Sequence, residues 1–180
     1  MYDFKLVTPD NADELAKPIL ADVKAKYGMV PNFFGALGID GASLTAFLAM
    51  QENAVKLTSL SKKAQELIAL AVGNENGCHY CVSGHTFSAT KMAGLTKEAC
   101  VQAQKGLSDY AKEQAIINVA LEIVRNRGKV SAETLAAAKN AGITEAQIVQ
   151  ITLFTAMNSF TNWVNNIVDP AIDFPAVDLV

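Results

Sequence analysis

The sequence predicts an all-α protein, and three observations support this prediction. Residues 32–169 contain no proline, which leaves room for long helices. No stretch alternates steadily between apolar and polar residues, so signals for strands are weak. Residues that cap helices and glycines that end them recur along the chain. The 180 residues are 51% hydrophobic, which is enough for the core of a single domain spanning 1–180.

The first half of the chain should form helices separated by short breaks. Pro18 fits the first turn of a helix that ends at Gly28. Residues 29–41, "MVPNFFGALGIDG", indicate a turn-rich connection that carries buried aromatic rings. Ser61 is a typical N-cap, and "GNENG" at 73–77 should break the helix that it begins. The later helices of this half are expected over 43–56, 62–72 and 78–92.

The second half repeats part of this pattern. "KMAGLTKEACVQA" at 91–103 resembles "KNAGITEAQIVQI" at 139–151, which suggests a degenerate internal helical repeat. The second copy lacks cysteine, so the repeat does not need thiols to hold it together. The caps and glycine stops place helices over 96–105, 108–127, 131–141 and 144–168. Residues 173–180, "DFPAVDLV", are too apolar for a free tail and are expected to dock on a neighbouring subunit.

Charge and hydropathy exclude several classes of protein. The net charge is −3 and no basic stripe occurs, so we expect no nucleic-acid partner and no anionic membrane surface. Apolar runs such as "LIALAV" are far shorter than the roughly 20 residues of a membrane span. The first residues do not resemble a signal peptide, which favours the reducing cytoplasm. A close cysteine pair there is more often catalytic or metal-binding than structural.

Two cysteines and a histidine share one face of the helix expected over 78–92. At about 100° per residue, Cys78, Cys81 and His85 fall within an arc of about 60°. Cβ atoms at these spacings lie about 5–6 Å apart, so a small adjustment lets the two sulfurs close and reopen a disulfide. The helix start favours thiolate, and His85 lies one turn from Cys81, where it can accept a proton.

Glu66 is expected to meet this face from the preceding helix. If the two helices form an antiparallel hairpin, Glu66 and His85 lie at the same height. The neighbouring "LIALAV" indicates a buried helix, and a buried carboxylate needs a partner. The carboxylate would then orient His85 and stabilise its charged form.

Other interpretations of these residues stay open at this stage. The cysteine pair is also compatible with a structural staple, or with a zinc knuckle completed by Glu66 or His79. Tyr80 either lines the site or simply packs. Cys100 has no partner in the sequence and is expected to be a small core residue.

The motif E66-x11-C78-H-Y-C81-x3-H85 resembles the signature of the AhpD-like alkylhydroperoxidases of the carboxymuconolactone decarboxylase superfamily. "VPNFFGALG" before it, "KMAGLTKE" after it and "FTAMNSFTNWVNNIVD" near the end agree with peroxidase-related members. The resemblance covers most of the chain. It implies an all-α AhpD-like helical domain that assembles into a homo-oligomer, often a trimer or hexamer.

The resemblance also implies a thiol-dependent peroxidase that needs no metal, haem or flavin cofactor. In that chemistry Cys81 attacks the hydroperoxide, and Cys78 resolves the resulting sulfenic acid to a disulfide. His85 and Glu66 form the proton relay, with Tyr80 at the site. A dithiol or a lipoylated protein would be the reductant. The alternatives are a decarboxylase-like lyase that uses His85 as acid and base, and a zinc-binding protein.

Overall fold

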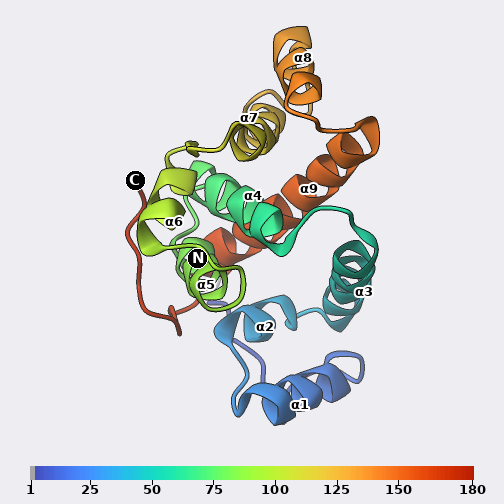
Figure 1. The fold of residues 1–180 in the computed structure, drawn as a ribbon. Coiled ribbons are helices and arrows are strands. Elements are labelled where there is room, and N and C mark those ends of the chain that lie inside the picture. The colour runs from blue at the N-terminus through green and yellow to red at the C-terminus, as the bar shows by residue number, and fades with distance from the viewer. Residues whose placement is uncertain (1–2) are drawn as a thin grey trace.

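The computed structural model describes residues 3–180, and within them the chain forms nine α-helices and no strand, which confirms the all-α prediction (Figure 1). In chain order the helices are α1 (Ala16–Tyr27), α2 (Asn32–Leu37), α3 (Gly41–Leu57), α4 (Lys62–Glu75), α5 (His79–Met92), α6 (Lys97–Gln104), α7 (Ala111–Arg125), α8 (Ala132–Asn140) and α9 (Glu145–Val168). Across residues 3–180, none of these helices combines the length and hydropathy that crossing a bilayer requires.

Helix α4 forms the centre of the molecule. It packs against α5, α6, α7 and the long α9, and Figure 1 shows it between α5 and α6 on one side and α7 on the other. Every residue from 64 to 73 is buried, as the all-round apolar character of "LIALAV" predicted. Helices α1, α2 and α3 form a smaller layer that reaches this body through contacts of α2 and α3 with α9.

Short side chains begin most of the helices that follow the first third of the chain. The hydroxyls of Ser61, Thr96, Ser131 and Thr144 each accept a hydrogen bond from a backbone N–H in the first helical turn, which confirms these predicted starts. The two copies of the internal repeat also share one turn. Gly94 and Gly142 have φ of 71° and 78°, and the apolar residue after each is buried.

The sequence-based prediction was wrong for residues 29–41, because part of this connection is helix α2. The first turn of a helix leaves backbone N–H groups without partners inside the helix. In α2, side chains from distant segments accept hydrogen bonds from these groups. Asn32 N–H donates to the Asp173 carboxylate at 2.5 Å, and Phe33 N–H donates to the Tyr80 hydroxyl at 3.0 Å. Tertiary contacts therefore stabilise a helix that local signals do not indicate.

Two predicted helix ends also differ from the structure. Helix α4 continues through Gly73 to Glu75. Gly73 packs closely against α5, where an added Cβ would lie 3.3 Å from Val82 Cγ2. Helix α7 begins at Ala111 rather than at Ser108. The Ser108 hydroxyl accepts from Tyr110 N–H at 3.3 Å and donates to Glu113 at 2.9 Å, so it stabilises the turn before the helix.

Residues 169–180, called the C-terminal strap here, lie along helices of the same chain; their predicted docking on a neighbouring subunit stays a prediction. Val177 N–H donates to Ser83 Oγ at 3.0 Å, and Val180 exchanges two backbone-to-side-chain hydrogen bonds with Asn74. The Phe174 ring packs on Tyr80 and Phe87 of α5. Figure 1 shows the strap running past α5 and α6.

Candidate active site

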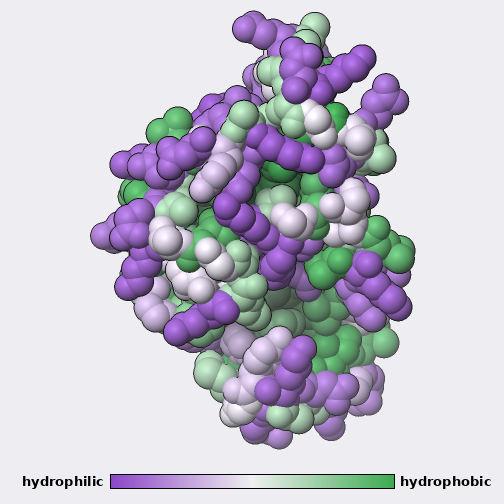
Figure 2. All heavy atoms as spheres, in the orientation of Figure 1, coloured by the Kyte–Doolittle hydropathy of each residue, from purple (hydrophilic) through white to green (hydrophobic). Residues whose placement is uncertain are grey.

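A pocket of about 430 Å³ lies between α2, α3, α4, α5 and α9. In Figure 2 a hollow with largely hydrophobic walls opens between the layer of α2 and α3 and the main body. Its apolar lining consists largely of aromatic rings and methionines, namely Tyr27, Phe33, Phe34, Phe47, Tyr80, Phe87, Met92, Phe154, Met157 and Phe174. Its acidic and basic side chains, Lys62, Glu66 and His85, come from α4 and α5, and Glu66 contacts both of the others. The pocket thus combines a largely apolar lining with a cluster of charged groups.

Glu66 and His85 meet across the α4–α5 hairpin. Glu66 Oε2 lies 2.8 Å from His85 Nδ1, as expected from their equal distance to the turn. The Glu66 side chain is only 3% exposed, whereas that of His85 is 34% exposed and lines the pocket. The carboxylate therefore holds the ring by Nδ1 and leaves the rest of the imidazole available to a bound molecule.

Two further side chains that were not predicted from the sequence bind Glu66. Ser88 donates its hydroxyl to Glu66 Oε1 at 2.6 Å, and Lys62 Nζ lies 3.1 Å from the same oxygen. The positions of both residues in the sequence could have indicated these contacts. Lys62 precedes Glu66 by four residues on α4, and Ser88 follows His85 by three on α5, so each pair shares a helix face.

These contacts keep Glu66 ionised although it is buried. Burial acts to raise the pKa of Glu66, but the charge of His85 and hydrogen bonds from His85 and Ser88 outweigh it, with a smaller contribution from Lys62. The net result is a pKa of about 2, against an ordinary value of 4.5. Glu66 is therefore a fixed negative charge that stabilises positive charge on the imidazole.

Cys78 and Cys81 form a disulfide, with their Cα atoms 5.3 Å apart. Cys78 is the N-cap of α5, and its sulfur accepts a hydrogen bond from Cys81 N–H at 3.2 Å. Both residues are buried, but they differ in position: Cys81 lines the pocket, whereas Cys78 lies behind it and is 1% exposed. Cys81 is thus the sulfur that a molecule in the pocket can reach.

Tyr80 lines the pocket and also has a clear packing role. Its hydroxyl accepts from Phe33 N–H, and its ring packs edge-on against Phe174 at 5.7 Å between centroids. Burial, together with the neighbouring Asp173 carboxylate, raises the pKa of Tyr80 above its ordinary value. The phenol therefore stays protonated at neutral pH and ties α5 to α2.

The other two residues singled out in the sequence lie away from this group. His79 is exposed on the first turn of α5. Cys100 is fully buried among α4, α6 and α7, and burial, helped by the charges of Glu66 and Glu98, raises its pKa to about 11. Residues 3–180 contain no group of three or more His, Cys, Asp or Glu side chains arranged to hold a metal ion. The zinc alternative has no ligand set among those residues.

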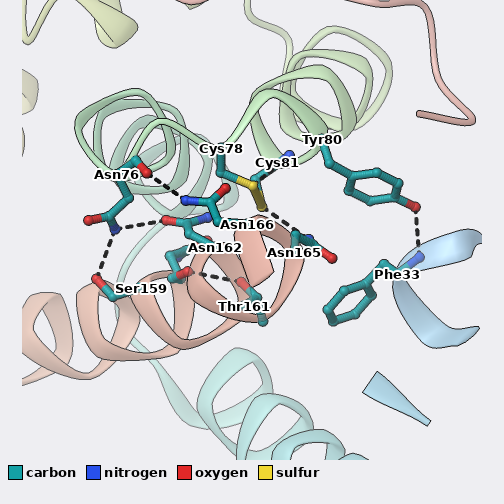
Figure 3. The surroundings of a disulfide bond; sticks show 11 residues. Phe33, Asn76, Cys78, Tyr80, Cys81, Ser159, Thr161, Asn162, Asn165 and Asn166 are labelled. Carbon is teal, nitrogen blue, oxygen red and sulfur yellow. Dashed lines mark hydrogen bonds between the residues drawn. A yellow bond between two sulfur atoms is a disulfide. The ribbon is translucent and has the colours of Figure 1, made fainter. Parts of the chain in front are cut away.

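Helix α9 supplies a contact to the cysteine pair that was not predicted from the sequence. Asn165 Nδ2 donates to Cys81 Sγ at 3.2 Å, and Figure 3 shows its side chain beside the disulfide. Asn76, which ends α4, donates to Asn162 of α9 at 3.0 Å and accepts at its carbonyl from Asn166 at 2.7 Å. These bonds hold α9 against the α4–α5 turn.

Residues 42–119 match the model of the carboxymuconolactone decarboxylase family. This segment, which is less than half of the chain and contains Glu66, Cys78, Cys81 and His85, is similar to that family. The resemblance of the chain to the AhpD-like members, predicted from the motif, is confirmed. The chain is 41% identical over 69 residues to alkyl hydroperoxide reductase AhpD of Corynebacterium kroppenstedtii and 36% identical over 67 residues to AhpD of Mycobacteroides abscessus. The matches span 38% and 37% of this chain and 38% of the length of each relative.

Solved structures with the same fold cover almost the whole chain. A peroxidase-related protein from Ralstonia eutropha, described as an alkylhydroperoxidase AhpD core, superposes with a TM-score of 0.83 at 21% identity, over 95% of this chain and 92% of its own. A peroxidase-related protein from Silicibacter sp. superposes with a TM-score of 0.81 at 21% identity, over 96% of this chain and 93% of its own. The debrominase Bmp8 superposes with a TM-score of 0.75 at 19% identity, over 93% of this chain and 90% of its own. The AhpD-like fold predicted from the motif is therefore confirmed.

Proposed function

We propose that the chain is a thiol-dependent peroxidase that reduces organic hydroperoxides through a Cys78–Cys81 dithiol and disulfide cycle. The observation that carries this proposal is the placement of Cys81 in the pocket, with His85 one helical turn along and Glu66 fixing the imidazole at 2.8 Å. The family and the partial AhpD relatives support the class of reaction.

The cycle balances with these residues alone and a dithiol reductant. The Cys81 thiolate attacks the terminal oxygen of ROOH, the O–O bond breaks, and His85 gives a proton to the leaving alkoxide, which departs as ROH. Cys81 is then a sulfenic acid. The Cys78 thiol attacks its sulfur, water leaves, and the disulfide forms. A dithiol or a lipoylated protein restores both thiols by exchange. Such a cycle requires a reducing compartment, and we propose the cytoplasm.

The aromatic lining of the pocket supports a bulky organic substrate in preference to hydrogen peroxide. Rings from α2, α3, α5 and the C-terminal strap surround the space in front of Cys81. Burying the apolar groups of an organic hydroperoxide against such a lining favours binding, whereas hydrogen peroxide has no apolar group to bury. Cumene hydroperoxide is therefore expected to have a lower KM than hydrogen peroxide.

Single cysteine variants test the proposal. Cys81→Ser should abolish hydroperoxide consumption driven by dihydrolipoamide, whereas Cys78→Ser should allow one turnover and stop at the sulfenic acid. Full turnover in both variants would refute the mechanism.

Because the debrominase of similar fold has been solved in complex with 2,3,4-tribromopyrrole, that compound should be tested as a substrate as well. If the protein released bromide but consumed no hydroperoxide, the proposed peroxidase activity would be wrong and a reductive dehalogenase activity would take its place.

The alternative is a lyase in which His85 is acid and base for a carbonyl substrate. The exposed part of the imidazole and the ionised Glu66 behind it favour this chemistry. The variant in which both Cys78 and Cys81 are replaced by serine separates the two functions. A lyase keeps its activity without the sulfurs, and a thiol peroxidase loses it.

We also propose that the chain forms a homo-oligomer. Apolar side chains remain exposed along one side of α9, and Val149, Trp163 and Ile167 are each more than half exposed. Patches of this kind on a helix commonly mark subunit interfaces. Light scattering of the purified protein should give a trimer or hexamer, and a monomer at micromolar concentration would refute this part.

A further inference from the structure

Asn165 combines three properties on α9. Its Nδ2 donates to Cys81 Sγ at 3.2 Å, its side chain lines the pocket, and the residue is only 4% exposed. In Figure 3 it extends from α9 toward the sulfur and lies on the same side as Tyr80 and Phe33, which also line the pocket. An amide group thus lies where the reactive sulfur meets the bound molecule.

The other polar atom of this amide lacks a partner. Asn165 Oδ1 is fully buried, and no group within residues 3–180 donates a hydrogen bond to it. A buried acceptor left unpaired costs about 1–3 kcal/mol, so an unpaired acceptor in a folded protein calls for an explanation, such as a catalytic role or a bound molecule. Among the buried polar atoms that lack a partner in this part of the chain, this one belongs to a residue that lines the pocket and contacts Cys81. A donor on a molecule bound against Cys81 would give this acceptor a partner.

The start of α5 supplies a hydrogen-bond donor to Cys78 rather than to Cys81. The backbone N–H of Cys81 points at the sulfur of Cys78, so the helix N-terminus stabilises negative charge on Cys78. Cys81, three residues along, receives its hydrogen bond from Asn165 instead. Asn165 thus shifts the balance toward the sulfur that faces the pocket.

We propose that Asn165 is a catalytic residue of the peroxidase reaction, with one role for each of its polar atoms. Its N–H group stabilises the Cys81 thiolate, and its Oδ1 accepts a hydrogen bond from the O–H of the hydroperoxide. The second bond aligns the terminal oxygen with the sulfur. After the O–O bond breaks, the same Oδ1 accepts from the S–O–H group of the sulfenic acid while Cys78 attacks. Asn165 exchanges no proton, so His85 remains the proton donor. The second role rests on the proposed function, and the first does not.

The neighbouring asparagines make their hydrogen bonds elsewhere. Asn76 donates to Asn162 at 3.0 Å, and Asn166 donates to the Asn76 carbonyl at 2.7 Å, so neither bond involves the Asn165 amide. Asn166 is exposed, and its amide donates to a backbone carbonyl rather than to a sulfur. It provides a matched control, because Asn166→Ala removes an amide from the adjacent position of the same helix without touching Cys81.

The test measures alkylation of Cys81 by iodoacetamide as a function of pH, in a Cys78→Ser background. Asn165→Ala and the nearly isosteric Asn165→Leu should each raise the midpoint by about one pH unit, a tenfold loss of thiolate below the midpoint that corresponds to about 1.4 kcal/mol. Asn166→Ala should leave the midpoint within about 0.3 pH unit of the Cys78→Ser parent, well below the shift expected for the Asn165 variants. Circular dichroism and thermal unfolding check that each variant folds. One folded Asn165 variant is enough for the test. An unchanged midpoint in a folded variant would overturn the donor role.

Hydroperoxide kinetics test the acceptor role and separate it from the proposed function. With cumene hydroperoxide, Asn165→Leu should lower the second-order rate of Cys81 oxidation by more than tenfold beyond the loss of thiolate. A rate that follows the thiolate fraction alone would overturn the acceptor role. If the protein with native Asn165 consumes no hydroperoxide while its midpoint still depends on Asn165, the proposed function fails and the donor role stands.

Discussion

Replacing Glu66 with Gln should remove a pH-dependent part of the folding free energy. The carboxylate lies 2.8 Å from His85, 2.6 Å from Ser88 and 3.1 Å from Lys62, and its pKa falls from 4.5 to about 2. Each pKa unit is worth about 1.4 kcal/mol, so the ionised carboxylate contributes about 3 kcal/mol. Because the folded-state pKa lies below the unfolded value, this contribution is present in full above about pH 5 and is lost as the pH falls toward 2.

The assay is urea denaturation of the reduced protein, followed by far-UV circular dichroism at pH 5.5 and pH 3. Linkage predicts that Glu66→Gln costs about 3 kcal/mol at pH 5.5 and only about 1 kcal/mol at pH 3. Glu75→Gln is the matched control, since Glu75 pairs with Arg125 at 2.7 Å but near the surface, where such pairs contribute less than about 1 kcal/mol. A cost for Glu66→Gln that is no larger than the control, or equal at both pH values, would refute the reasoning.

Two further predictions concern Tyr80 and Cys100. Tyr80→Phe leaves Phe33 N–H without its acceptor, so thermal unfolding should show a loss of about 1 kcal/mol, while kcat for hydroperoxide should stay within about twofold. A tenfold fall in kcat would instead place the phenol in the chemistry. Cys100 is buried with a pKa of about 11, so iodoacetamide at pH 8 should label Cys78 and Cys81 of the reduced native protein but not Cys100. Comparable labelling of Cys100 in peptide mass spectra would contradict this.

Local sequence signals were sufficient for most helices and for the pairing of Glu66 with His85. Ser61, Thr96 and Thr144 begin helices through hydrogen bonds within one turn, so their effect is visible in a few adjacent residues. The meeting of Glu66 with His85 followed from counting residues on either side of a short turn, because both helices rise equally per residue. In both cases the interacting groups are close in sequence.

The features that escaped prediction depend on contacts between distant segments. Helix α2 is stabilised at its start by Tyr80 and Asp173, which lie 47 and 141 residues away. Asn165 reaches Cys81 across 84 residues, and no spacing rule relates a position on α9 to one on α5. The contacts of the C-terminal strap with α4 and α5 also escaped prediction, because its apolar character indicates burial but not the surface that buries it.

Mass spectrometry of the reduced protein after one equivalent of cumene hydroperoxide shows which cysteine reacts first. If Cys81, which lines the pocket with His85 and Asn165, is oxidised first and is resolved by Cys78, the protein loses two hydrogens, gains a Cys78–Cys81 bridge and keeps an unmodified Cys100. In Cys78→Ser, Cys81 should gain one oxygen. Oxygen found on Cys78 in the Cys81→Ser variant at the same rate, or oxidation spread over all three cysteines, would contradict this order of oxidation.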